Sequence, residues 1–418
     1  MSALHVLPFH PIVSYTIAFM GSSALFLLAA YRLCKTELKD TIVYAMIGLA
    51  LCVRLLFIAA QPVGSDDLYR YVWDGNVQSH GINPYAYAPA APELAHLATE
   101  KIPSLVNHPE MKTIYFPLSE WVFYLSYRLS GEEAWGIKLL LFLSEVCALG
   151  GLWLLLQRLD VPRRFMLIYA FCPMLIFEYA IDAHVDGFGL PLLVFALYAY
   201  FGKRKLLSMV LLGLSLSIKP TALVLLPVFF FAEKQWKQRF TISLVPLLVL
   251  GIQFAPYMFS AQPFESLSTF TKNWTFNGFV FNALNWYVAD NQRTRLICSV
   301  ILAILVVILS VSKRELFDKL YYALLLLLLL SPVVHPWYVG WLVALLPAAR
   351  KWSGLVFVST LSLTCFTYIS YQLHGVWSEE PVVWLSEYIP VIALMGMELA
   401  STRVAFFRRF ECASSGRD

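Results

Sequence analysis

Long apolar runs of 13 to 25 residues alternate with short charged breaks along most of the chain. A backbone inside a lipid bilayer has to satisfy its own hydrogen bonds, and a helix does so within one segment. The pattern therefore predicts an all-α integral membrane protein built as a polytopic helix bundle. It excludes Rossmann, TIM-barrel and all-β folds.

The basic residues set the expected topology. The short breaks, together with the tail from Arg403, contain 21 of the 31 Lys and Arg residues. By the positive-inside rule these segments face the cytoplasm. Threading the chain through them predicts about 13 transmembrane helices, with a periplasmic N-terminus and a cytoplasmic C-terminus. The predicted spans begin near residues 12, 41, 132, 166, 188, 206, 220, 240, 294, 320, 337, 353 and 383.

The composition agrees with a membrane protein. Of the 418 residues, 59% are hydrophobic and only 14% are charged, whereas soluble domains have about 25% charged residues. The net charge of +4 is too small to suggest nucleic acid as a partner, so the expected surroundings are a lipid bilayer. We expect one transmembrane domain over residues 1–418, with outer loops at 61–131 and 260–293 that contribute to an active site.

Two apolar stretches are too short to cross the membrane and return. The arms at 206–218 and 221–231 each rise only ~20 Å or less, against a hydrocarbon core of ~30 Å. The turn at Lys219 is therefore expected to lie recessed in the membrane, and the same holds for residues 331–338. Interrupted helices at membrane depth line cavities, and charged groups there are expensive unless they serve a function. The two turns are predicted to form a polar floor under an outward-facing pocket.

The first outer loop contains two vicinal aspartates. Ser65 is a good N-cap, which would place Asp66 and Asp67 in a first helical turn, where the helix dipole favours ionised carboxylates. The alternative is an acidic turn that only caps a solvated interfacial helix.

Helical spacing separates the directions of the two aspartates. Asp67, Tyr71 and Asp74 share one face, whereas Asp66 is expected to pair with Arg70 at i,i+4. Asp67 is therefore the preferred catalytic carboxylate. Asp66 is the runner-up, because a shift of one residue in the first turn would exchange their directions.

Two more polar clusters fall in predicted outer segments. The turn between the fourth and fifth spans contains Glu178, Asp182, His184 and Asp186. Its His-x-Asp pair could ligate a divalent metal, but the ligand set is incomplete, so no cofactor is expected. The loop before the ninth span interleaves amide and aromatic groups, which suit sugar recognition and equally suit an interfacial aromatic belt.

These residue types favour one reaction. With no activated Ser or Cys evident, a recessed cation and an ionised carboxylate suggest a displacement in which a phosphate leaves. Lys219 is expected to contact the donor phosphate, with His335 of the second recessed turn as its helper. Hydrolytic glycosidases need two carboxyl groups that flank the scissile bond, and the vicinal pair Asp66 and Asp67, about 100° apart on a helix, is poorly placed for that.

The order of the motifs resembles the GT-C superfamily of polytopic glycosyltransferases that use polyprenyl-phosphate sugars. Within it the chain is most similar to bacterial polyprenol-phosphomannose-dependent mannosyltransferases, over about residues 60 to 345. The motifs are Ser65-Asp66-Asp67 followed by Tyr71, Asp74 and Gly75, then Gly81-Ile82-Asn83-Pro84-Tyr85, His184-x-Asp186, Ser217-Ile218-Lys219-Pro220 and His335-Pro336-Trp337-Tyr338. The resemblance implies a catalytic aspartate in the first outer loop, a role that the spacing to Tyr71 and Gly75 gives to Asp67.

The residue types favour a displacement in which a phosphate leaves, and the resemblance implies that the reaction is inverting transfer of a hexose, with mannose favoured. It further implies a polyprenyl-phosphate-linked sugar as donor and a glycan or lipid hydroxyl as acceptor, at the outer face of a bacterial inner membrane. The candidate substrate-binding residues are Arg70, Tyr71, Asp74, Asn83, Tyr85, Glu178, Asp182, His184, Asp186, Asn273, Trp274, Asn277, Trp337 and Tyr338.

Two alternatives stay open. A lipid-linked sugar flippase or secondary transporter would also use broken helices and intramembrane charge, although transporters usually contain inverted repeats and the sequence shows none. An undecaprenyl-diphosphate glycan ligase would be favoured by larger outer loops rich in Arg, and only Arg293 and Arg295 stand close together here.

Overall fold

A computed structural model describes residues 10–401, which form two compact units. The first unit contains the described residues up to 51, residues 152–177 and those from 275 onward. The second unit contains residues 52–151 and 178–274. Among the described residues, β pairing is limited to isolated bridges of Phe276 and Asn277 with Val333, so the predicted all-α class is confirmed.

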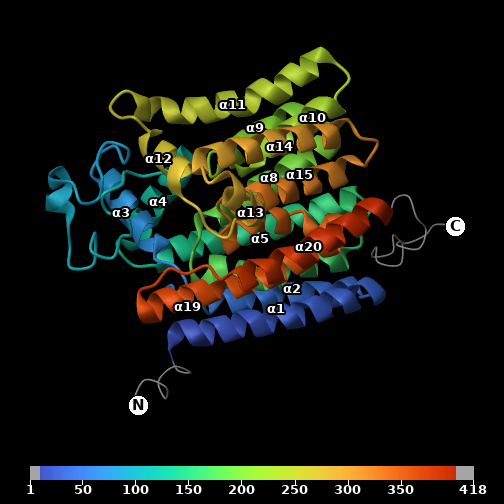
Figure 1. The fold of residues 1–418 in the computed structure, drawn as a ribbon, viewed down its shortest axis with the longest axis horizontal. Coiled ribbons are helices and arrows are strands. Elements are labelled where there is room, and N and C mark those ends of the chain that lie inside the picture. Colours follow the sequence, from blue (N-terminus) through green and yellow to red (C-terminus); the bar gives the residue numbers. More distant parts are fainter. Residues whose placement is uncertain (1–9, 402–418) are drawn as a thin grey trace. The chain divides into compact units, whose positions relative to one another are not determined.

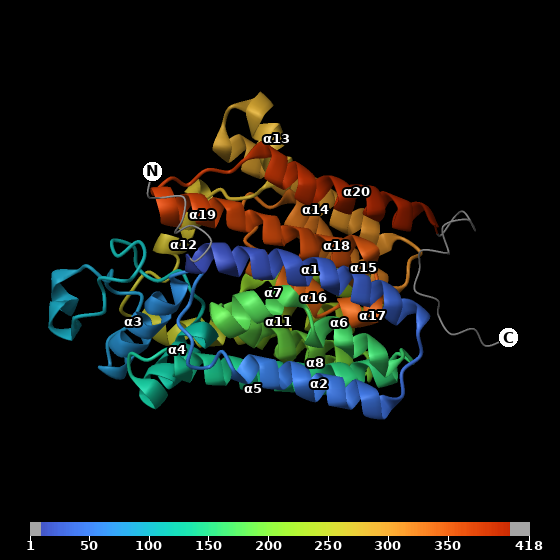
Figure 2. The same cartoon turned by 90° about the horizontal axis from the view of Figure 1, so that it is seen from below.

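In the first unit, long helices pack side by side. Helix α1 lies along α18 and α19, and α18 lies along α20 (Figure 1, Figure 2). Most of α2 (Asp40–Leu55) belongs to this unit, which it leaves after residue 51. The other helices of the unit are α1 (Pro11–Lys35), α6 (Met166–Ala170), α7 (Pro173–Leu175), α13 (Phe279–Val288), α14 (Asn291–Val311), α15 (Leu316–Leu330), α16 (Gly340–Val343), α17 (Leu346–Ala349), α18 (Trp352–Thr360), α19 (Cys365–His374) and α20 (Pro381–Ser401).

In the second unit, α9 packs between α8 and α11, and α3 packs against α4 (Figure 1). Most of α5 (Trp135–Arg158), up to residue 151, belongs to this unit. The other helices of the unit are α3 (Asp67–Ser79), α4 (Pro117–Ser130), α8 (Gly189–Phe201), α9 (Lys205–Leu216), α10 (Leu226–Ala232), α11 (Trp236–Met258) and α12 (Glu265–Asn273).

Helices begin within a few residues of every predicted span start. Within residues 10–401, six helices are long and apolar enough to cross a membrane: Pro11–Lys35, Trp135–Arg158, Trp236–Met258, Asn291–Val311, Trp352–His374 and Pro381–Ala400. The bent pair Arg163–Ala170 and Pro173–Ile181, with an angle of 48°, would make a seventh. Transmembrane helices are therefore confirmed and the number 13 is not, because elements such as α8, with 13 residues, rise only ~20 Å.

The segment predicted as the first outer loop, residues 61–131, contains two helices, α3 and α4. A Cβ added at Gly75 of α3 would lie 2.3 Å from the carbonyl oxygen of Phe123 in α4. Glycine therefore allows the two backbones to approach closely. The rings of Tyr71 and Phe123 stack across this contact with centroids 4.5 Å apart, so α4 supports the helix that begins at Asp67.

The predicted helix breaks at the two turns are confirmed. Helix α9 ends at Leu216 and a 3-10 helix begins at Pro220. The start of α4 ties down the end of α9, because the Leu118 N–H donates to the carbonyl oxygen of Ser217 at 3.1 Å. In the first unit, α15 ends at Leu330, and the N–H of Phe276 donates to the carbonyl oxygen of Pro332 at 2.9 Å. The depth of both turns in a membrane stays a prediction.

Candidate active site

Asp66 and Asp67 stand at the N-terminus of α3, as predicted, but the cap differs. The N-cap is Asp66 and the helix begins at Asp67, so the expectation that Ser65 would be the cap is wrong by one residue. The Ser65 hydroxyl instead accepts a bond of 3.3 Å from the Asp67 N–H. Because Asp66 precedes the helix, its side chain does not follow the helical spacing on which the predicted directions were based.

Both aspartates share a partner that the sequence did not reveal. The amide nitrogen of Asn107 donates to Oδ1 of Asp66 at 2.8 Å and to Oδ1 of Asp67 at 2.9 Å. Asn107 follows the aspartates by about 40 residues, and no local pattern links it to them. This bridge holds the two carboxylates in fixed directions.

Arg70 pairs with Asp74 and not with Asp66, which corrects the prediction. Nε of Arg70 lies 2.9 Å from both carboxylate oxygens of Asp74, and Nη1 donates to the carbonyl oxygen of Met111 at 2.9 Å. Both side chains are buried, and a buried charge needs a close opposite charge. The i,i+4 spacing allows either pair, but only Arg70 and Asp74 both lie inside the helix. Their predicted contact with substrate stays a prediction.

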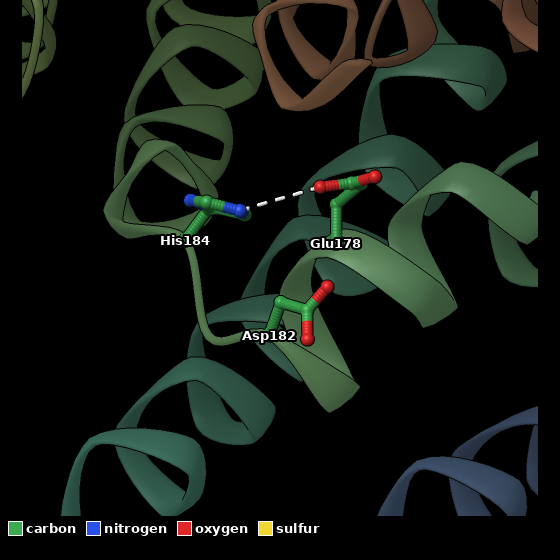
Figure 3. A group of neighbouring side chains, drawn as sticks. All are labelled: Glu178, Asp182 and His184. Atoms are coloured by element: carbon green, nitrogen blue, oxygen red, sulfur yellow. Dashed lines mark ion pairs between the residues drawn. The ribbon is translucent and has the colours of Figure 1, made fainter. Parts of the chain in front are cut away.

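The second polar cluster folds around an irregular stretch of backbone. Glu178 lies in a π-helical segment, Ile176–Ile181, of the kind that is frequent at functional sites. Ala183 adopts a left-handed conformation with φ of 64°, and His184 is the N-cap of a 3-10 helix, Val185–Phe188. This reversal turns the His184 ring back toward Glu178 (Figure 3).

The structure joins the first two clusters through His184. Its Nδ1 lies 3.6 Å from Oδ2 of Asp67, and its Nε2 lies 3.3 Å from Oε2 of Glu178. The side chains of His184 and Glu178 are 0% and 1% exposed, whereas that of Asp67 is 22% exposed. Of these three side chains, Asp67 is therefore the one that a molecule from outside can contact.

The surroundings of His184 favour a positive charge. Burial alone would lower the pKa of the imidazole, but the carboxylates of Asp67 and Glu178, at 3.6 and 3.3 Å from its ring nitrogens, raise it to about 9. The two carboxylates therefore favour the charged form of His184. Its ring lies between them and orients the carboxylate of Asp67.

Asp182 fastens the start of the first outer segment. Its Oδ1 accepts hydrogen bonds from the backbone N–H groups of Val63 and Gly64, at 2.7 and 3.0 Å. Glu178, Asp182 and His184 can offer ligand atoms within 4.8 Å of one another, as a cation would require. A metal would have to displace the proton of His184, because a ligating imidazole is neutral.

Lys219 of the broken α9–α10 hairpin pairs with Asp186. Its Nζ lies 2.9 Å from Oδ1 and 3.0 Å from Oδ2 of Asp186. The Lys219 side chain is 22% exposed and that of Asp186 only 2%, and the charge of Asp67 also acts on Lys219. The predicted cation and the predicted base thus belong to one electrostatic cluster, which the sequence analysis had not connected through Asp186.

Two family comparisons identify the kind of protein. The family model described as alpha-(1->6)-mannopyranosyltransferase, N-terminal domain, matches residues 2–234, more than half of the chain. The model described as MptB C-terminal domain matches residues 278–395.

The chain belongs to the alpha-(1->6)-mannopyranosyltransferase family. The predicted resemblance and the predicted mannosyltransferase class are therefore confirmed. A comparison with curated proteins gave no match. Asp67, His184 and Lys219 all lie in the part of this mannosyltransferase that the N-terminal family model covers.

Other candidates in the second unit, Asn83, Tyr85 and Tyr71, make contacts within that unit, and their binding of substrate stays a prediction. The side chain of Asn83 donates to the Tyr257 carbonyl oxygen at 3.0 Å and to the Ser260 hydroxyl at 2.8 Å. The buried Tyr85 donates its hydroxyl to the carbonyl oxygen of Tyr115 at 2.8 Å. Tyr71 is buried under Asp67, and burial, followed by the charge of Asp67, raises its pKa well above the usual value.

Asn273 and Trp274 end helix α12 of the same unit. The Asn273 side chain donates to the carbonyl oxygen of Thr269 at 3.0 Å, and the Trp274 ring meets the His108 ring edge-on, with centroids 4.9 Å apart. A direct contact of either residue with sugar stays a prediction.

The remaining candidates lie in the first unit. His335, Trp337 and Tyr338 are in the part that the C-terminal family model covers, and Asn277 directly precedes that part. Asn277 is buried and donates its side-chain amide to Glu387 at 2.7 Å and to Thr364 at 3.2 Å. Glu387 was missed by the sequence analysis, because it stands within an apolar run. The predicted substrate contact of Asn277 stays a prediction.

The turn at residues 331–338 contains an aromatic stack. The His335 ring stacks on Trp337, with centroids 4.2 Å apart, and on Phe276, with centroids 4.5 Å apart. Tyr338 meets the His335 ring edge-on at 5.4 Å. The predicted help of His335 to Lys219 in phosphate binding stays a prediction.

Proposed function

We propose that the protein is a GT-C-type, inverting mannosyltransferase with a polyprenyl-phosphate mannose donor and an acceptor hydroxyl on a glycan or lipid. The reaction would take place at the outer, periplasmic face of a bacterial inner membrane. The observation that carries the proposal is the position of Asp67, which is partly exposed, bridged by Asn107 and held by the buried His184.

Asp67 is the general base of the proposed reaction. It accepts the proton of the acceptor hydroxyl while the hydroxyl oxygen forms a bond with the anomeric carbon of the sugar. His184 and Asn107 fix the direction of the carboxylate before the substrate arrives, which removes an entropic part of the barrier.

Lys219 stabilises the leaving group. The bond between the anomeric carbon and the phosphate oxygen breaks, both electrons remain on that oxygen, and the phosphate departs as an anion beside the ammonium group. Asp186 orients Lys219, since its Oδ1 lies 2.9 Å from Nζ. A single displacement inverts the anomeric carbon, so the α-linkage in the family's name requires a donor with a β-linked phosphate.

The reaction is proposed without a metal, because Lys219 supplies the positive charge beside the leaving group. A cation held by Glu178, Asp182 and His184 would require a neutral His184, so sensitivity of transfer to EDTA would indicate a metal there.

The experiment is a transfer assay with purified protein in detergent. Polyprenyl-phosphate [¹⁴C]mannose and an α-(1→6)-linked mannan oligosaccharide should yield an extended oligosaccharide and free polyprenyl phosphate. Movement of intact donor across vesicle membranes without cleavage would instead indicate a flippase. Transfer of a whole glycan from a diphosphate carrier would indicate a ligase.

A further inference from the structure

A cavity in the first unit has the side chains of a carbohydrate site. Its volume is about 440 Å³, within the range of about 300–1,000 Å³ typical of small-molecule sites. It is lined by Asn282, Ala283, Trp286, Tyr287, Glu379 and Trp384. These residues come from α13, from the start of α20 and from the segment just before α20, and α13 contacts α20 (Figure 2).

The aromatic rings around the cavity are accessible. Trp286 and Tyr287 are each 85% exposed, although large aromatic side chains are normally buried on average. Trp384 is held in place by the ring of Phe279, with centroids 5.8 Å apart. Aromatic faces of this kind can stack on the apolar face of a pyranose ring while the hydroxyls of the sugar remain available for hydrogen bonds.

Polar groups in the cavity are held in position. Oε2 of Glu379 accepts a hydrogen bond of 2.6 Å from the backbone N–H of Asn277, so the carboxylate has a fixed direction. Asn277 is itself buried and adopts a left-handed conformation, with φ of 51°. One turn along α13, Asn282 lies at i,i+4 from Trp286, so its amide and the indole share a helix face.

The start of α13 cannot shift easily. A Cβ added at Gly278 would lie 2.8 Å from the carbonyl oxygen of Ser331, so the chain passes closely over the turn that follows α15. A carboxylate, an amide and aromatic rings around one cavity match a polyhydroxylated ring better than a lipid tail, which would need neither polar group.

We propose that this cavity binds mannose units of the acceptor chain, a role for the C-terminal family domain that is separate from the chemistry at Asp67. The inference rests on the proposed function only for the identity of the sugar. The whole cavity lies within residues 278–395, which the second family model covers.

The test is direct binding without donor. Purified full-length protein is titrated with α-(1→6)-linked mannotetraose, and maltotetraose serves as a sugar of different linkage and stereochemistry. Trp286→Ala should raise the Kd for mannotetraose about 10-fold, the equivalent of one lost stacking contact, and Trp286→Phe should recover part of the affinity. Trp286 is so exposed that its replacement leaves folding intact.

The matched control is Trp236→Ala. Trp236 is also an exposed tryptophan, 64% accessible, but it lies at the start of α11 and outside the cavity. Its variant should bind mannotetraose like the wild type. Equal affinity in the wild type and Trp286→Ala overturns the proposal. The proposal is also overturned if Trp286→Ala and Trp236→Ala lose vesicle association equally and neither changes sugar binding. That result would assign Trp286 to a membrane-interface belt.

The two proposals fail separately. Mannotetraose binding that depends on Trp286, in a protein that transfers no mannose, would support the cavity and contradict the proposed function. Mannose transfer by the wild type, together with an unchanged Kd of Trp286→Ala for mannotetraose, would support the proposed function and contradict the role of the cavity.

Discussion

Replacing His184 with Gln removes a positive charge that lies between two carboxylates. At 3.3 Å from Glu178 and 3.6 Å from Asp67, each attraction amounts to about 5 kcal/mol at an effective dielectric constant of about 20. Desolvation of the buried charges offsets much of this gross energy. Removing one partner of a buried pair typically costs about 3–5 kcal/mol, because the other charge stays behind. We expect His184→Gln to lower the free energy of unfolding by this amount.

A double-mutant cycle with Glu178→Gln isolates the pair. In His184→Gln/Glu178→Gln no charge remains at the 1% exposed position of Glu178, so the double variant should be more stable than the sum of the single losses by about 1–3 kcal/mol. The assay is reversible unfolding in mixed detergent micelles, followed by circular dichroism. Losses that add within about 0.5 kcal/mol would refute the inference that the two side chains form a charged pair.

Three further predictions concern the donor, the proton on His184 and the topology. Lys219→Met should weaken binding of polyprenyl-phosphate mannose at least ~10-fold, since a charge-assisted contact is worth about 1.5–3 kcal/mol, and unchanged donor affinity and turnover would make Lys219 a structural partner of Asp186. Burial opposes the charge of His184, but the nearby carboxylates of Asp67 and Glu178 raise its pKa to about 9, above the ordinary 6.5. This stabilisation is therefore complete below pH ~6.5 and disappears as the pH rises through ~9. The melting temperature of the wild type should therefore fall between pH 7 and 10 more steeply than that of His184→Gln. Single cysteines near Asp67, His184 and Asn277, in a Cys-free background, should react with a membrane-impermeant thiol reagent in intact cells, and protection at all three with labelling at residues 203–205 would invert the topology.

The positions of the helices follow closely from the apolar pattern. The predicted breaks at Lys219 and at residues 331–335 are also present, because short arms and prolines determine them locally. The count of spans does not follow in the same way, since α8 and α9 are apolar but too short to cross a bilayer. Helix α4 was treated as part of a loop, because its 14 residues mix aromatic and polar side chains without a long apolar run.

The site shows the same division between local and distant information. Asp67 and the cluster around His184 could be predicted as candidate site residues from the sequence immediately around them. The contact between Asp67 and His184 joins residues more than a hundred positions apart. The links of Asn107 to the aspartates span about 40 positions, and the link of Lys219 to Asp186 spans 33. Such pairings depend on the tertiary fold. The erroneous pairing of Arg70 with Asp66 arose because two i,i+4 partners were available and burial decided between them.

The most direct test of the account compares Asp67→Asn with Asp66→Asn. The two residues are matched, since both stand at the start of α3 and both accept a hydrogen bond from Asn107, but His184 contacts Asp67. Turnover of polyprenyl-phosphate mannose with an α-(1→6)-linked mannan acceptor, measured alongside donor affinity, separates their roles. Asp67→Asn should reduce turnover at least ~10²-fold, a typical share for a general base, with donor affinity nearly unchanged, and Asp66→Asn should have a milder effect. Small and equal losses in both variants would contradict the account, and the base would then have to be sought at Glu178, Asp182 or Asp186.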